Sequence, residues 1–108
     1  MEELIRLTAR EAVQRLATRQ VSPLELIDAA ERRINETDGA LNAVPTRCFD
    51  RARTHAKRLM AERPADPPPG YLYGLPIAVK DLTDVEGGIG AAGSARMSYF
   101  RKKAAARW

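Results

Sequence analysis

Apolar and polar positions alternate with a helical period in three segments of the first 62 residues. In the first of these segments, Thr8 and Glu11 form a capping box. In this motif, the threonine oxygen accepts a backbone N–H and the glutamate carboxylate accepts another in return. A helix is therefore expected to begin after Thr8. The apolar residues expected to face the core in this helix are Ala9, Ala12, Val13 and Leu16.

A second helix is expected to begin after Ser22. This serine forms a second capping box with Glu25, and Pro23 occupies the first helical position, where its missing N–H is not needed. The helix should end near Gly39, because glycine readily adopts the left-handed conformation that closes many helices. Its expected core residues are Leu26, Ile27, Ala30 and Ile34.

An extended, half-buried stretch is expected over residues 41–45, followed by a third helix over about residues 46–62. The expected core residues of this helix are Phe49, Ala52, Ala56, Leu59 and Met60. Four prolines within residues 64–69 then predict a surface connector. The apolar run over residues 77–79 is typical of a buried strand. One strand cannot cover three amphipathic helices, so the chain is interpreted as the front of a larger α/β domain.

The net charge of +4 is distributed unevenly along the chain. Residues 1–87 carry 13 basic and 14 acidic side chains, whereas residues 88–108 carry five basic side chains and no acidic one. We interpret the basic segment as a solvated end and do not expect nucleic-acid binding, because no nucleic-acid-binding fold accompanies it. A basic-tailed binding fragment without enzymatic activity is the alternative.

The sequence argues against several classes of protein. Cys48 and His55 are the only cysteine and histidine, so neither an internal disulfide nor a zinc site is expected. No stretch approaches the roughly 18 apolar residues that span a bilayer, and the N-terminus has no apolar signal region. We therefore expect a cytoplasmic protein without a membrane partner. His55 is interpreted as a helix-surface residue and Cys48 as a packed cysteine.

Lys80 is the candidate catalytic residue. It directly follows the predicted strand, at the carboxyl end where open α/β sheets build their sites. An amine that is buried loses its proton more readily, and the neutral form is a competent base. A lone lysine at a strand end is also commonly a plain surface group, so the position alone leaves both interpretations open.

Residues 4–87 resemble the amidase signature family of amide-bond hydrolases. The matching segments are LTAREAVQRL at 7–16, SPLELIDAA at 22–30, LNAVPTR at 41–47 and GLPIAVKDLTDVEG at 74–87. The resemblance implies an α/β fold with a mixed sheet surrounded by helices, of which this chain holds the N-terminal helices and the first core strand. It also implies that Lys80 is the catalytic lysine, with Asp81 as the acidic residue after it, and that Gly74 and Pro76 form the turn before the strand.

The same resemblance implies a Ser–Ser–Lys triad without metal or cofactor. In that family, a neutral lysine takes a proton from a bridging serine, which activates a nucleophilic serine for attack on the amide carbonyl. The family's serine-rich segment is not recognised in this chain, whose serines are Ser22, Ser94 and Ser98. We therefore interpret residues 1–87 as the N-terminal part of an amidase domain. Residues 88–108 are interpreted as a divergent Gly/Ala-rich and basic tail, resulting from truncation or a shifted reading frame.

The expected function is thus that of a fragment of a small-molecule amide hydrolase, inactive on its own. An alternative within the family is a fragment of the A subunit of the tRNA-dependent amidotransferase, which would act with partner subunits.

Overall fold

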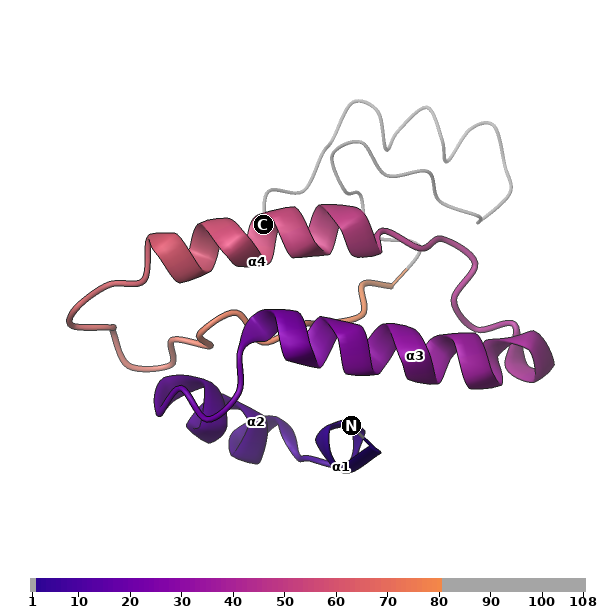
Figure 1. The fold of residues 1–108 in the computed structure, drawn as a ribbon, viewed down its shortest axis with the longest axis horizontal. Helices are drawn as coiled ribbons and strands as arrows, with labels where there is room; N and C mark the ends of the chain where they lie inside the picture. Colours follow the sequence, from indigo (N-terminus) through magenta and orange to yellow (C-terminus); the bar gives the residue numbers. More distant parts are fainter. Residues whose placement is uncertain (1, 81–108) are drawn as a thin grey trace. The chain divides into compact units, whose positions relative to one another are not determined.

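The computed structural model describes residues 2–80 and places four helices in them (Figure 1). They are α1 (Glu2–Ile5), α2 (Ala9–Ala17), α3 (Pro23–Leu41) and α4 (Phe49–Ala61). No helix in the described part of the chain is long and apolar enough to cross a membrane.

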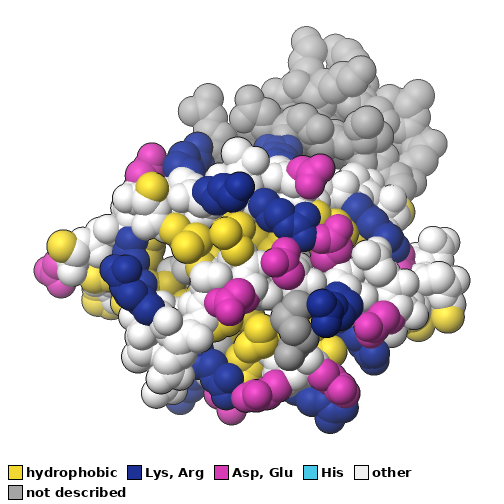
Figure 2. Space-filling view, in the orientation of Figure 1, with side chains coloured by type: hydrophobic (Ala, Val, Ile, Leu, Met, Phe, Trp, Pro, Cys, Tyr) yellow, Lys and Arg dark blue, Asp and Glu magenta, His cyan; other side chains and the backbone are white. Residues whose placement is uncertain are grey.

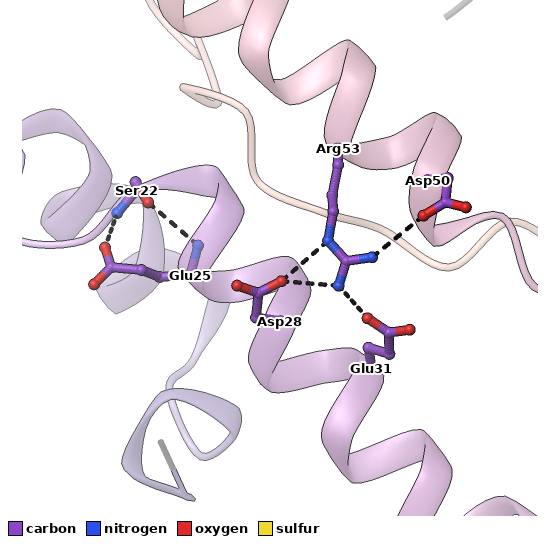
Figure 3. Close-up of polar contacts among 6 residues, drawn as sticks. All are labelled: Ser22, Glu25, Asp28, Glu31, Asp50 and Arg53. Atoms are coloured by element: carbon purple, nitrogen blue, oxygen red, sulfur yellow. Dashed lines mark hydrogen bonds and ion pairs between the residues drawn. The ribbon is translucent and has the colours of Figure 1, made fainter.

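Both predicted capping boxes are confirmed. At the start of α2, the Glu11 backbone N–H donates to the Thr8 hydroxyl oxygen at 3.3 Å, and the Thr8 backbone N–H donates to the Glu11 carboxylate at 2.7 Å. At the start of α3, the corresponding distances between Ser22 and Glu25 are 3.2 and 2.7 Å (Figure 3). Two of the free N–H groups at each helix start are thereby satisfied.

The predicted end of α3 is wrong by about two residues, because Asn42 rather than Gly39 closes the helix. Asn42 adopts the left-handed conformation at φ 51°, and its N–H donates to the Asp38 carbonyl at 2.6 Å. The Asp38 carboxylate also accepts the N–H of Ala43 at 2.6 Å. Asparagine tolerates a positive φ better than most residues, so it can take the terminal position usually given to glycine. Leu41, expected in an extended half-buried stretch, is helical and exposed.

The third predicted helix is shorter than expected, because α4 begins at Phe49 and not near residue 46. Cys48 is its N-cap and offers no side-chain cap. Among the five residues expected to face the core from this helix, only Ala56 is fully buried, and Met60 is 45% exposed.

The described residues fall into two units, residues 2–43 with 48–76, and residues 44–47 with 77–80. In the first unit, α3 contacts both α1 and α4. Its hydrophobic core is small, and its buried members are aliphatic. The buried members of the core cluster are Ala12, Leu16, Val21 and Leu26, and Leu4, Leu7, Tyr73 and Leu75 pack against them.

The strand predicted over residues 77–79 is not observed. Residues 77–80 have no regular secondary structure, and Ile77 and Val79 are 61% and 41% exposed. A strand is stabilised by hydrogen bonds to a neighbouring strand, and residues 2–80 contain none. A strand-forming sequence without a partner strand therefore stays irregular here.

Candidate functional site

Lys80, the predicted catalytic lysine, lies at the end of the described chain with an exposed side chain. Asp81, Ser94 and Ser98 lie outside the described residues. Lys80 belongs to the second unit, of which residues 44–47 and 77–80 are described.

A turn lies ahead of Lys80, but it spans Leu72–Leu75, so it contains Gly74 as predicted and not Pro76. The Leu75 N–H donates to the Leu72 carbonyl at 3.0 Å, and both residues between them have positive φ angles, 55° at Tyr73 and 85° at Gly74. Two consecutive positive φ values are typical of a type I′ turn. Tyrosine rarely adopts this conformation, so contacts around the turn must stabilise it.

Gly74 makes one of these contacts, because it lies directly against Pro23, the first residue of α3. A Cβ atom at Gly74 would lie 2.7 Å from Cγ and 3.2 Å from Cβ of Pro23. Pro23 is itself buried and held in a rigid ring. Only glycine allows the turn to approach α3 this closely.

Arg63 supplies the second contact. Its guanidinium donates to the carbonyls of Leu16 and Ala17, at 3.3 and 2.7 Å, and so satisfies acceptors at the end of α2. The same group lies 4.7 Å from the centre of the Tyr73 ring, within cation–π distance. Tyr71 packs against Tyr73 edge to face, with ring centres 4.8 Å apart.

An ion cluster between α3 and α4 was not anticipated from the sequence. Arg53 of α4 donates to the Asp28 carboxylate at 2.8 and 3.1 Å and to the Glu31 carboxylate, and Asp50 lies 3.7 Å away (Figure 3). The hydrogen bonds to Glu31 and Asp28 raise the pKa of the Arg53 guanidinium above its ordinary value. The signal in the sequence was two acids three positions apart on one helix, but the opposing arginine depends on how the helices pack.

The cluster borders an open hollow of about 550 Å³. The residues that line it all have charged or polar side chains, and they are Asp28, Glu31, Arg32, Asn35, Glu36 and Arg53. Within residues 2–80, no group of three His, Cys, Asp or Glu side chains is arranged to hold a metal ion. On the face shown in Figure 2, basic and acidic side chains are interspersed rather than separated into a basic stripe. The arrangement is that of helix-to-helix ion pairing.

The remaining candidates carry no chemistry in the described structure. Ser22 is engaged as the N-cap of α3, as expected. His55 is half-buried on α4, so it is less exposed than a helix-surface residue. Cys48 is exposed, which corrects its interpretation as a packed cysteine, because α4 begins one residue later and leaves the thiol outside the helix.

The turn and the lysine after it belong to a segment that is shared with known enzymes. Residues 25–107 match the Amidase family, so the chain belongs to the amidase family and the resemblance read from its motifs is confirmed.

Its relatives include the A subunit of glutamyl-tRNA(Gln) amidotransferase from Anaeromyxobacter dehalogenans, which is 42% identical over 93 residues. An amidase from Pseudomonas putida is 36% identical over 87 residues, and the AtzE subunit of 1-carboxybiuret hydrolase from a Pseudomonas species is 36% identical over 84 residues. These alignments cover 86%, 81% and 78% of this chain, respectively.

The chain spans about a fifth of the length of these relatives, with coverage of 19%, 18% and 18%. It is therefore an amidase-family fragment by comparison with them. No solved structure shows significant similarity to the chain.

Proposed function

We propose that this chain is the N-terminal part of an amide-hydrolysing enzyme in which Lys80 is the catalytic base. The observation that carries the proposal is the Amidase match over residues 25–107, which includes Lys80 and the preceding turn at Tyr73–Gly74. By this proposal, the complete domain is an α/β fold in the cytoplasm, with a mixed sheet that pairs with residues 77–79.

The proposed chemistry is acyl transfer by a Ser–Ser–Lys triad. The neutral amine of Lys80 takes a proton from a bridging serine, and this serine deprotonates the serine that attacks the carboxamide carbon. Collapse of the tetrahedral intermediate breaks the C–N bond, and the leaving nitrogen takes the proton back from Lys80 through the bridging serine. Water then hydrolyses the acyl-enzyme. The two serines come from outside the described residues, and Ser22 is not one of them because its hydroxyl caps α3.

Lys80 needs further protein around it to work as a base. Its side chain is exposed in residues 2–80, whereas an amine is deprotonated most easily when it is removed from water. A sheet in which residues 77–80 pair with neighbouring strands, and whose faces are covered by helices, would provide this environment. The isolated chain is accordingly proposed to hydrolyse no simple amide.

A second candidate function is that of the A subunit of a tRNA-dependent amidotransferase. It is favoured by the relative at 42% identity, which is named as this subunit of glutamyl-tRNA(Gln) amidotransferase. In that case, the same lysine chemistry would release ammonia from an amide donor, and partner subunits would be required.

A hybrid enzyme tests the role of Lys80. Residues 1–87 replace the aligned residues of the Pseudomonas putida amidase, and carboxamide hydrolysis is measured for the hybrid and its variants. Lys80→Arg keeps the positive charge but cannot give up its proton, so it should lower kcat nearly as far as Lys80→Ala, by well over about tenfold. Lys57→Arg makes the same exchange on the exposed side of α4 and should leave kcat unchanged.

Retention of more than about a tenth of the activity by the Lys80→Arg hybrid, a barrier change below roughly 1.4 kcal/mol, would contradict the role of a base. The same replacement made in the amidotransferase relative from Anaeromyxobacter separates the two candidate functions. A hybrid active only there, and only with its partner subunits, supports the amidotransferase.

A further inference from the structure

We infer that Arg63 is a positioning residue that fixes the Leu72–Leu75 turn to the end of α2, and so fixes where the segment bearing Lys80 leaves the helical unit. The inference rests on the proposed function for the importance of Lys80. The anchoring itself rests on contacts within the first unit alone.

The Leu72–Leu75 turn holds Tyr73 in a strained backbone conformation. Tyr73 has a φ of 55°, which is unfavourable for a residue with a Cβ atom. The Leu72–Leu75 hydrogen bond closes the turn but does not remove this strain. A strained tyrosine persists only where its surroundings hold it, and its ring contacts are therefore expected to be part of the turn's stability.

Arg63 holds the Tyr73 ring in place. Arg63 is partly buried and makes two kinds of contact. Its two terminal nitrogens donate to the carbonyls of Leu16 and Ala17, and its Cζ atom lies over the Tyr73 ring, 4.7 Å from the ring centre. The α2 carbonyls orient the guanidinium plane, and that plane in turn holds the ring. Lysine cannot replace it, because an ammonium is neither planar nor bidentate.

The length of chain between Leu75 and Lys80 limits how far apart these two residues can lie. Lys80 follows Leu75 by five residues, and an extended chain advances about 3.3–3.6 Å per residue. Its Cα atom is therefore limited to within roughly 18 Å of the Leu75 Cα atom. A fixed turn restricts the positions that Lys80 can occupy, whereas a released turn would enlarge that range.

Amide hydrogen exchange on the whole 108-residue chain tests the anchor without depending on activity. In Arg63→Gln, the Leu75 N–H should exchange at least about tenfold faster, while the amides inside α3 keep their wild-type rates. Tyr73→Phe keeps an aromatic ring and should retain most of the protection, whereas Tyr73→Leu should lose it. In the wild type, the Arg63 side-chain protons should show an upfield ring-current shift that Tyr73→Leu abolishes.

Equal acceleration at Leu75 and throughout α3 would mean that Arg63 only adds global stability, and the inference would then be wrong. Unchanged exchange at Leu75 would also overturn it. Arg63→Lys decides the matter if Arg63→Gln does not fold, because it should accelerate Leu75 exchange selectively while keeping the charge. Since none of these readouts involves amide hydrolysis, failure of the anchor is distinguishable from failure of Lys80 as a base.

Discussion

The close approach of Gly74 to Pro23 makes a quantitative prediction for Gly74→Ala. A residue with a Cβ atom at a positive φ is disfavoured by about 1–2 kcal/mol. The added methyl group would also lie 2.7 Å from Pro23 Cγ, and relieving such overlap in a packed site costs about 1–3 kcal/mol. Together, these effects should lower the free energy of unfolding by about 2–5 kcal/mol, a large share of the stability of a small domain.

Two other glycines serve as controls. Gly70 shares the positive φ of Gly74 but not its close contact, and Gly39 has neither. Gly70 has a similar φ of 82°, but a methyl group placed there would have no atom within 4 Å, so Gly70→Ala should show only the backbone effect of about 1–2 kcal/mol. Gly39 lies inside α3 with equally open space. Gly39→Ala should stabilise the chain by about 0.5–1 kcal/mol, because alanine is the better helix former.

Urea denaturation followed by far-ultraviolet circular dichroism measures all three variants on one scale. Equal losses for Gly74→Ala and Gly70→Ala would contradict this prediction, because the contact with Pro23 would then have no effect. A double-mutant cycle provides a second check. Pro23→Ala removes Cγ but leaves Cβ, so Gly74→Ala should be less destabilising in that background than in the wild type.

Two further predictions concern charged side chains. Hydrogen bonds from the Thr8 backbone and hydroxyl lower the pKa of Glu11. Its contribution to stability is therefore present above the ordinary glutamate pKa and is lost as the pH falls through the lowered pKa. Urea denaturation at a series of pH values should show this loss in the wild type, and the free energy of unfolding should depend less on pH in Glu11→Gln. Arg53→Met leaves the Asp28 and Glu31 carboxylates without their shared cation, so this variant should melt at a lower temperature than Arg58→Met on the same helix. Added salt should reduce the difference between the two melting temperatures. Identical melting temperatures would argue against a stabilising ion cluster.

The starts of α2 and α3 were predictable from the sequence because their determinants are local. The partners in each capping box are three residues apart, and no tertiary structure is needed to bring Thr8 to Glu11 or Ser22 to Glu25. The end of α3 was less predictable, because glycine and asparagine can both adopt a left-handed cap. The Asp38 carboxylate, which binds the Ala43 N–H, favours the later position, and this interaction is not part of the glycine rule.

The candidate site was predictable only in part. The motif around Lys80 identified the family because residue types at fixed spacing carry that information directly. The strand over residues 77–79 did not form among the described residues, since strand formation depends on a partner strand that a local pattern cannot supply. Arg53 and Arg63 were missed for a related reason. Arginines are frequent in this chain, and only the packing of the helices distinguishes these two from the others.

The contacts of Arg63 also bear on the order in which the chain acquires its structure. The two hydrogen bonds of Arg63 each join residues that are 46 or 47 positions apart in the sequence, whereas the residues of each capping box are three positions apart. During synthesis, the residues of α2 and α3 are added to the chain before residue 63, so their local contacts can form before those of Arg63. Closing a long loop is slower than forming a local turn of helix. The strained turn at Tyr73 is therefore among the last parts of the helical unit to form, and slow steps in refolding should be sought there rather than in the helices.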